Sequence, residues 1–107
     1  MDNQHRKIVG YRELSKEEVD LMNRIKAKGA ELLALQAELL VRLDTDSEVK
    51  KAAAIASQYA PNDFASAEYQ EYNRFQAAEP LRWAAIGKTD IQTGIMALVR
   101  AVAQPAV

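Results

Sequence analysis

The sequence predicts an all-α protein, and three observations support that fold class. Hydrophobic residues make up 49% of the chain, and much of that share is alanine and leucine, which lose little on entering a helix. Glycine and proline are scarce, with 4 and 3 residues. No stretch of strand length alternates apolar and polar residues with β-branched enrichment. We therefore expect a small protomer built from long antiparallel helices.

The chain has 107 residues, which predicts one helical domain over residues 1–107. A domain of this size buries a limited fraction of its surface, so we expect a homo-oligomer. The net charge is −1, which argues against a DNA-binding protein. Cysteine is absent, so disulfides and thiolate metal sites are excluded. Neither a signal peptide nor a membrane-spanning run is visible, which predicts a soluble intracellular protein.

The first predicted helix covers about residues 15–43, after a lead-in over residues 1–14. Ser15 and Glu18 have the spacing of a capping box, and Leu14 is a candidate staple residue. Gly29 interrupts the apolar pattern and is either a close helix contact or a weak point. The predicted apolar stripe is broad and needs partners on more than one side. It consists of Met22, Ile25, Leu32, Leu39 and Leu43, with Leu33 and Leu40 as a second row.

The segment Asp44–Ser47 is predicted to end this helix and to cap a second one over about residues 48–59. Its acidic spacing resembles a calcium loop, but Val49 and Ile55 stand where the loop's glycine and bidentate glutamate belong. The capping interpretation is therefore preferred. Pro61-Asn62-Asp63 then predicts a turn that also supplies a cap.

Two further helices are predicted, over about residues 64–79 and 80–104. Pro80 either kinks one continuous helix or begins a new one. The aromatic residues of the third predicted helix are more typical of a hydrophobic core or a subunit interface than of a surface on which bases stack. The last helix carries a dense apolar stripe that suggests burial between subunits. Its members are Ile91, Ile95, Leu98 and Val102, with Met96 and Val99 alongside.

Motifs for catalysis are missing, so we expect no enzyme activity, no cofactor and no metal. Gly87-Lys88-Thr89 resembles the end of a phosphate-binding loop, but Arg82 stands where its first glycine belongs. His5 is the only histidine, which leaves a catalytic triad or a histidine metal site without its parts. The carboxylates lie on what we expect to be solvated helix faces.

A tyrosine and a group of cations remain as candidates for binding. Tyr11 precedes the first helix and could pack on the domain or offer its ring to a base. Stacking of a base on an aromatic ring contributes about 1–3 kcal/mol to binding. Lys26 belongs to a cationic group with Arg24 and Lys28 and projects at the margin of the apolar stripe. It could lay its stem along that margin with its charge in water, or meet a phosphate at a subunit interface. The residues alone favour the structural alternatives.

Two blocks of the chain resemble the phage-encoded anti-CBASS proteins that sequester cyclic nucleotides (anti-CBASS protein two). They read HRKIVGYRELSKEEVDLMNRIK and RWAAIGKTDIQTGIMALVRAVAQP, and the similarity covers roughly residues 5–43 and 81–105. CBASS is a bacterial defence in which an infected cell makes a cyclic oligonucleotide that switches on a killing effector. The middle of the chain, about residues 44–80, has no distinctive match.

The resemblance implies a helical protomer in a hexamer that binds a cyclic dinucleotide between two protomers and does not cleave it. Tyr11 matches the tyrosine that stacks on a base, and Lys26 matches the lysine that contacts the phosphates. Arg12 and Lys28 are secondary candidates. Some members hold cyclic trinucleotides in a separate pocket, for which Lys28 is a candidate here. Such a protein would act in the cytoplasm of the infected bacterium. The alternative is a helical oligomeric adaptor or structural protein with no nucleotide ligand.

Overall fold

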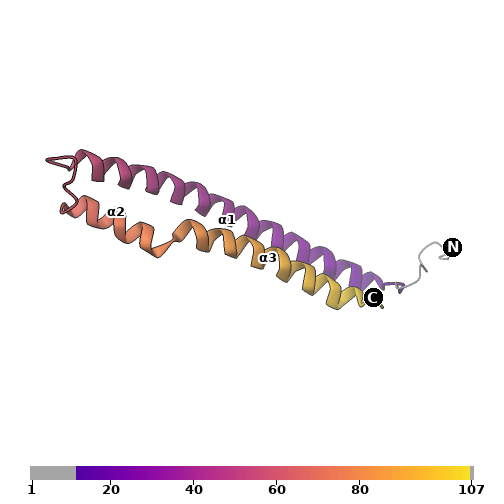
Figure 1. Ribbon diagram of the computed structural model, residues 1–107. Coiled ribbons are helices and arrows are strands. Elements are labelled where there is room, and N and C mark those ends of the chain that lie inside the picture. Colours follow the sequence, from indigo (N-terminus) through magenta and orange to yellow (C-terminus); the bar gives the residue numbers. More distant parts are fainter. Residues whose placement is uncertain (1–11, 107) are drawn as a thin grey trace. The chain divides into compact units, whose positions relative to one another are not determined.

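The computed structural model describes residues 12–106 and is built from three helices (Figure 1). They are α1 (Lys16–Ala56), α2 (Ala67–Ala78) and α3 (Pro80–Ala103). Residues 12–106 contain no strand, so the all-α prediction is confirmed. The described chain forms two compact units. We call residues 12–34 with 89–106 the terminal unit, and residues 35–88 the central unit.

Helix α1 begins with the predicted capping box. The Ser15 hydroxyl oxygen accepts a hydrogen bond from the Glu18 backbone N–H at 3.1 Å, and the Ser15 N–H donates to Glu18 Oε1 at 3.0 Å. This exchange satisfies two backbone donors that the first turn of a helix leaves without partners. The start of the first predicted helix is therefore confirmed.

The predicted break at Asp44–Ser47 is wrong, because α1 continues through it without interruption. The Thr45 hydroxyl donates to the Val41 carbonyl oxygen at 3.1 Å, and Arg42 Nε lies 3.9 Å from Asp46 Oδ2. The polar side chains thus find partners one turn away along the same helix. No glycine or proline stands between Gly29 and Pro61 to end the helix sooner. The helices predicted over residues 15–43 and 48–59 are one helix.

The turn after α1 is also organised differently from the prediction. Asp63 does not cap α2; its carboxylate accepts hydrogen bonds from the Tyr59 N–H at 3.3 Å and the Ala65 N–H at 3.2 Å. The cap is Ser66, whose hydroxyl oxygen accepts from the Tyr69 N–H at 3.0 Å. Helix α2 consequently starts three residues later than predicted, at Ala67.

Pro80 begins a new helix, which is one of the two predicted alternatives. Helix α2 ends at Ala78, and Glu79 adopts a left-handed conformation with φ 51° and ψ 49°. The Glu79 N–H still donates to the Gln76 carbonyl oxygen at 3.0 Å, so the last turn of α2 is closed. Pro80 then occupies the first position of α3, where its missing N–H costs no helical hydrogen bond.

In the terminal unit, α1 and α3 run antiparallel and meet closely at Gly29. Gly29 is buried, and a Cβ built on it would lie 2.2 Å from Ile95 Cδ1. This confirms the close helix contact that the sequence left as one of two options. The apolar stripe is rotated from the predicted one, since Leu32 and Leu98 are 49% and 56% exposed. The half-buried positions are Met22, Ile25, Leu33, Ile91, Ile95, Val99 and Val102.

In the central unit, the second part of α1 packs against α2 and the start of α3. Gln36 Nε2 donates to the Ala84 carbonyl oxygen at 3.0 Å, and the Ser57 and Ser66 hydroxyls lie 2.6 Å apart. The predicted stripe residue Leu39 is 48% exposed, while Leu40 and Leu43 are half-buried. One partner layer covers only part of the broad stripe, so Leu40 and Leu43 face inward while Leu39 faces out.

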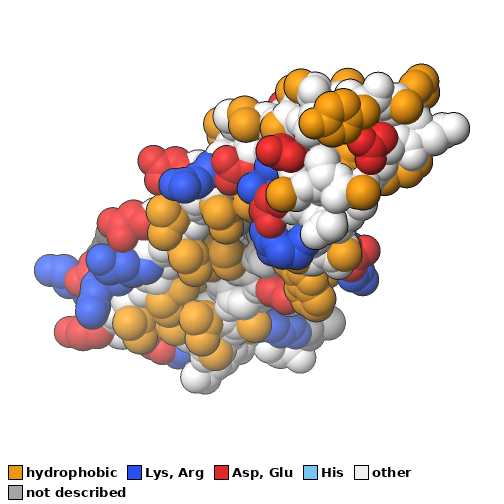
Figure 2. Space-filling view, turned by 90° about the vertical axis from the view of Figure 1, so that its left-hand side faces the viewer, with side chains coloured by type: hydrophobic (Ala, Val, Ile, Leu, Met, Phe, Trp, Pro, Cys, Tyr) orange, Lys and Arg blue, Asp and Glu red, His pale blue; other side chains and the backbone are white. Residues whose placement is uncertain are grey.

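Little of the described chain is fully buried, and much apolar surface is open. The only buried hydrophobic residues among residues 12–106 are Ala54, Phe75 and Ala84. Apolar side chains gather over much of the face seen in Figure 2, interrupted by charged ones. A monomer rarely leaves so much apolar surface uncovered. The large exposed side chains are Val19, Leu21, Leu32, Leu35, Leu39, Val41, Val49, Ile55, Tyr59, Phe64, Trp83, Met96 and Leu98.

Candidate functional site

Three of the four candidate residues are described by the structure, and all three lie in the terminal unit. Tyr11, with the rest of residues 1–11, is outside the described part of the chain. Arg12 lies in the lead-in to α1, and Lys26 and Lys28 lie on α1 itself. The structure gives the three described cations different surroundings.

Lys26 presents an exposed ammonium group from α1. It stands four residues after the half-buried Met22 and three before the buried Gly29, so it emerges at the edge of the helix contact. Among residues 12–106 it has no hydrogen-bond or ion-pair partner. Its charge is therefore available to an anion from outside the described chain.

Lys28 and Arg24 lie one helical turn apart at an open hollow of about 390 Å³. Leu21, Ile25 and Leu98 supply apolar walls to this hollow. Lys28 Nζ lies 3.5 Å from Glu31 Oε2, and both side chains are well exposed. The sequence grouped Arg24, Lys26 and Lys28 together, but the structure separates Lys26 from the hollow that the other two line.

Arg12 is fully engaged in contacts within the terminal unit. Its Nε donates to the Ala103 carbonyl oxygen at 3.2 Å, and its Nη2 donates to the Val102 carbonyl oxygen at 2.8 Å. Its Nη1 lies 3.3 Å from Glu18 Oε1, and Nη2 forms an ion pair with Glu18 Oε2. Arg12 thus joins the lead-in to the start of α1 and to the end of α3.

Hydrogen bonding explains the acidity of Glu18. The Arg12 guanidinium, followed by the Ser15 backbone N–H, lowers the pKa of Glu18 to about 2. The Glu18 carboxylate is consequently ionised at neutral pH and balances the charge of Arg12. Sequence reasoning missed this arrangement, because Arg12 and its α3 partners are separated by 90 and 91 residues.

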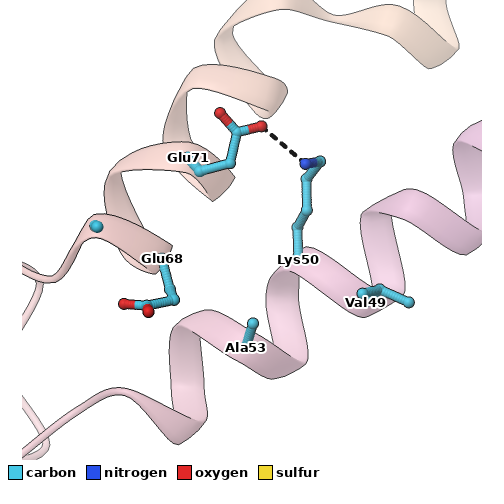
Figure 3. A pocket seen from close by; sticks show the side chains of 6 residues that line it. Val49, Lys50, Ala53, Glu68 and Glu71 are labelled. Carbon is cyan, nitrogen blue, oxygen red and sulfur yellow. Dashed lines mark hydrogen bonds and ion pairs between the residues drawn. The ribbon is translucent and has the colours of Figure 1, made fainter.

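A second hollow, of about 320 Å³, lies in the central unit between α1 and α2 (Figure 3). Lys50 and Glu71 point toward one another there, with Lys50 Nζ 2.8 Å from Glu71 Oε2, while the Glu68 carboxylate points away. Arg74 Nε donates to Glu71 Oε1 at 2.6 Å. These bonds, from Arg74 first and then Lys50, lower the pKa of Glu71 to about 2.

The pairing in this second hollow indicates a structural role. Lys50 Nζ also lies 5.8 Å from the centre of the buried Phe75 ring, a cation–π distance. The Lys50–Glu71 ion pair therefore ties α1 to α2 beside the small core, while Arg74 joins Glu71 from within α2. The sequence carried no local signal for the pair between helices, since Lys50 and Glu71 are 21 residues apart.

Residues 12–106 contain no group of three or more potential metal ligands. None of the three helices has the length and apolarity needed to cross a membrane.

Comparison with known proteins gives a match over nearly the whole chain. The family model described as "Acb2/Tad1, hairpin domain" matches residues 4–103. The chain is 71% identical over 105 residues to "Anti-CBASS protein 2" of Pseudomonas phage JBD67. That match covers 98% of this chain and 97% of the relative. It includes the middle segment, in which the sequence alone offered no distinctive resemblance.

Proposed function

The chain belongs to the Acb2/Tad1 hairpin-domain family of anti-CBASS protein two, and from this we propose that it sequesters cyclic dinucleotides to block CBASS immunity. The name of its 71% identical phage relative, "Anti-CBASS protein 2", states the anti-CBASS role. On this proposal the protein holds the signal without cleaving it. It acts in the cytoplasm of the infected bacterium, where the signal is made.

The exposed ammonium of Lys26 is the observation that carries the proposal. A phosphate needs a cation whose charge is not already neutralised, and Lys26 has no partner among residues 12–106. The other strong cation nearby, Arg12, is paired with Glu18. Lys26 is also the position that the family resemblance assigns to the phosphate contact, with Tyr11 stacking on a base.

Assembly is the second part of the proposal. A cyclic dinucleotide has two bases and two phosphates, so a pocket between two symmetry-related chains offers each feature twice. Exposed apolar side chains on α1 and α3 would be covered in such an oligomer, which the family resemblance implies is a hexamer. Nanomolar binding requires about −12 kcal/mol, and two stacked bases and two charge contacts can supply much of it.

A larger cyclic oligonucleotide is a second candidate ligand, favoured by the hollow beside Arg24 and Lys28. Its apolar walls with two cations at the rim suit a ligand that carries bases and phosphates. Lys28 shares its charge with Glu31, whereas Arg24 has no partner in the described part of the chain.

The experiment that tests the proposal is isothermal titration with 3′,3′-linked cyclic GMP–AMP, with the linear dinucleotide as control. We expect tight binding of the cyclic form alone, near one ligand per two chains. Intact ligand recovered after heat denaturation would separate a sponge from a hydrolase. Absence of binding to any cyclic di- or trinucleotide would favour the adaptor alternative, a helical oligomer without a nucleotide ligand.

A further inference from the structure

Arg12 connects two helix ends that lie far apart in the sequence. Its guanidinium donates to the Glu18 carboxylate in the first turn of α1, and to the carbonyl oxygens of Val102 and Ala103, the last two residues of α3. Within residues 12–106, the hydrogen bonds of the Glu18 side chain go to Arg12 and Ser15. The Glu18 side chain is therefore connected to the end of α3 through Arg12.

Both helix ends gain from this arrangement. Val102 and Ala103 are among the last four residues of α3, whose carbonyl oxygens have no N–H partner inside the helix. The negative end of the α3 dipole favours a guanidinium, and the positive end of the α1 dipole favours the Glu18 carboxylate. The Arg12 and Glu18 side chains are 37% and 29% exposed, so water screens their attraction only in part.

Helix ends ordinarily open with little cost in free energy, each by itself. Here the end of α3 cannot open without breaking the hydrogen bonds that Arg12 donates to it. The ion pair with Glu18 restricts the rotamers of the guanidinium and so keeps it aimed at the two carbonyl oxygens. A disturbance at the start of α1 is thus transmitted to the end of α3.

We propose that Arg12 is a clamp that couples the opening of the first turn of α1 to the opening of the last turn of α3, so that this end of the terminal unit opens cooperatively. The inference goes beyond the proposed function and requires no ligand. It concerns only residues whose contacts the structure describes.

Glu18→Gln separates a clamp from two independent contacts. Glutamine also serves in a capping box, so the start of α1 is preserved while the ion pair with Arg12 is lost. If Arg12 couples the two ends, the last turn of α3 should open more often, although the substituted side chain donates nothing to α3 and accepts nothing from it. If Arg12 binds α3 independently of Glu18, only the first turn of α1 should change.

The experiment measures amide hydrogen exchange of the full chain by mass spectrometry at short labelling times. We expect Arg12→Gln and Glu18→Gln each to exchange about tenfold faster in the last turn of α3, the effect of losing one charge-assisted hydrogen bond on an opening equilibrium. The double variant should be no faster than Arg12→Gln alone, because both changes remove the same clamp. Glu17→Gln and Arg100→Gln are the matched controls, since each removes an exposed charge from one of the same two helix turns.

Three results would overturn the inference. The first is unchanged exchange in the last turn of α3 of Glu18→Gln, and the second is an equal effect of Glu17→Gln. The third is equal acceleration in α2, which would indicate loss of overall stability instead of a local opening. Light scattering ensures that the variants are compared in the same state of assembly. If Arg12→Gln does not fold, the Glu18→Gln result decides.

Discussion

Ile95 of α3 occupies the space that a side chain at Gly29 of α1 would need. A Cβ at Gly29 would lie 2.2 Å from Ile95 Cδ1 and 2.6 Å from Cγ1. Rotation about χ2 can move Cδ1 away, but Cγ1 is fixed by χ1, which is stiff for isoleucine in a helix. The contact therefore depends on glycine.

Gly29→Ala should destabilise the protein even though alanine is the better helix former. Overpacking costs about 1–3 kcal/mol, and the gain in helix propensity offsets about 1 kcal/mol of that. We expect a net loss near 1 kcal/mol by urea unfolding. Gly94→Ala is the control, because a Cβ there meets nothing within 4 Å and should stabilise α3. A Gly29→Ala variant as stable as Gly94→Ala would contradict the close contact.

Lys26→Ala should weaken binding of a cyclic dinucleotide while the oligomer stays intact. A hydrogen bond to a charged group contributes about 1.5–3 kcal/mol, so each lost contact should cost tenfold or more in affinity. Isothermal titration and light scattering would measure the two properties. Lys51→Ala, which removes another exposed lysine of α1, should leave affinity unchanged. Dissociation of the assembly by Lys26→Ala would instead make Lys26 structural.

Proteolysis should distinguish one long α1 from two helices. Chymotrypsin is expected to cut first after Tyr59 or Phe64, which are 99% and 53% exposed in the turn between α1 and α2. Leucines within α1, such as Leu39 and Leu43, should resist because helical backbone does not fit a protease site. Mass spectrometry of the early fragments gives the result. Early cleavage near Asp44–Ser47 would contradict one continuous α1 and support the two helices that the sequence predicted.

Stability should fall in acid as Glu18 and Glu71 gain protons. Both pKa values are about 2 in the folded chain, and an unfolded carboxyl titrates near its usual value of about 4.3. The unfolded state therefore binds more protons as the pH drops, so the stabilisation present above about pH 5 disappears toward pH 2. In a plot of melting temperature against pH, Glu71→Gln should reduce the fall at low pH, and Glu38→Gln should not. If the plot for Glu71→Gln matched that of the unmodified chain, Glu71 would not be a source of the acid sensitivity.

Exposed leucines should control assembly if the proposed oligomer forms through α1. Leu35 and Leu39 are 58% and 48% exposed, and burial of a leucine stabilises by about 1.5–3 kcal/mol. Leu35→Ser with Leu39→Ser should shift analytical ultracentrifugation toward smaller species and make the melting temperature more dependent on concentration. Glu38→Ser, on the same stretch of α1, is the control. Unchanged mass in the double variant would place the interface elsewhere.

Local signals in the sequence predicted local structure well. The Ser15–Glu18 capping box and the start of α3 at Pro80 depend on neighbouring residues only, and both are present. The prediction of a break at Asp44–Ser47 was wrong because side chains that cap a helix can also form bonds inside one. The hydrogen bond from Thr45 to Val41 and the ion pair of Asp46 with Arg42 both form within a continuous α1.

Long-range contacts could not be predicted from one sequence. The clamp of Arg12 on Val102 and Ala103 depends on α1 and α3 lying antiparallel, which no local pattern specifies. Leu33 faces inward and Leu32 is exposed, and this difference likewise depends on where the partner helix lies. Tyr11 and Lys26 came from resemblance. For Lys26, the structure adds that its ammonium has no partner among residues 12–106.

The contact between Arg12 and the end of α3 also brings the first and the last part of the described chain close together. A short linker could therefore join them, with new ends opened in the turn at residues 58–65. Such a circular permutant would retain α1, α2 and α3 as uninterrupted segments.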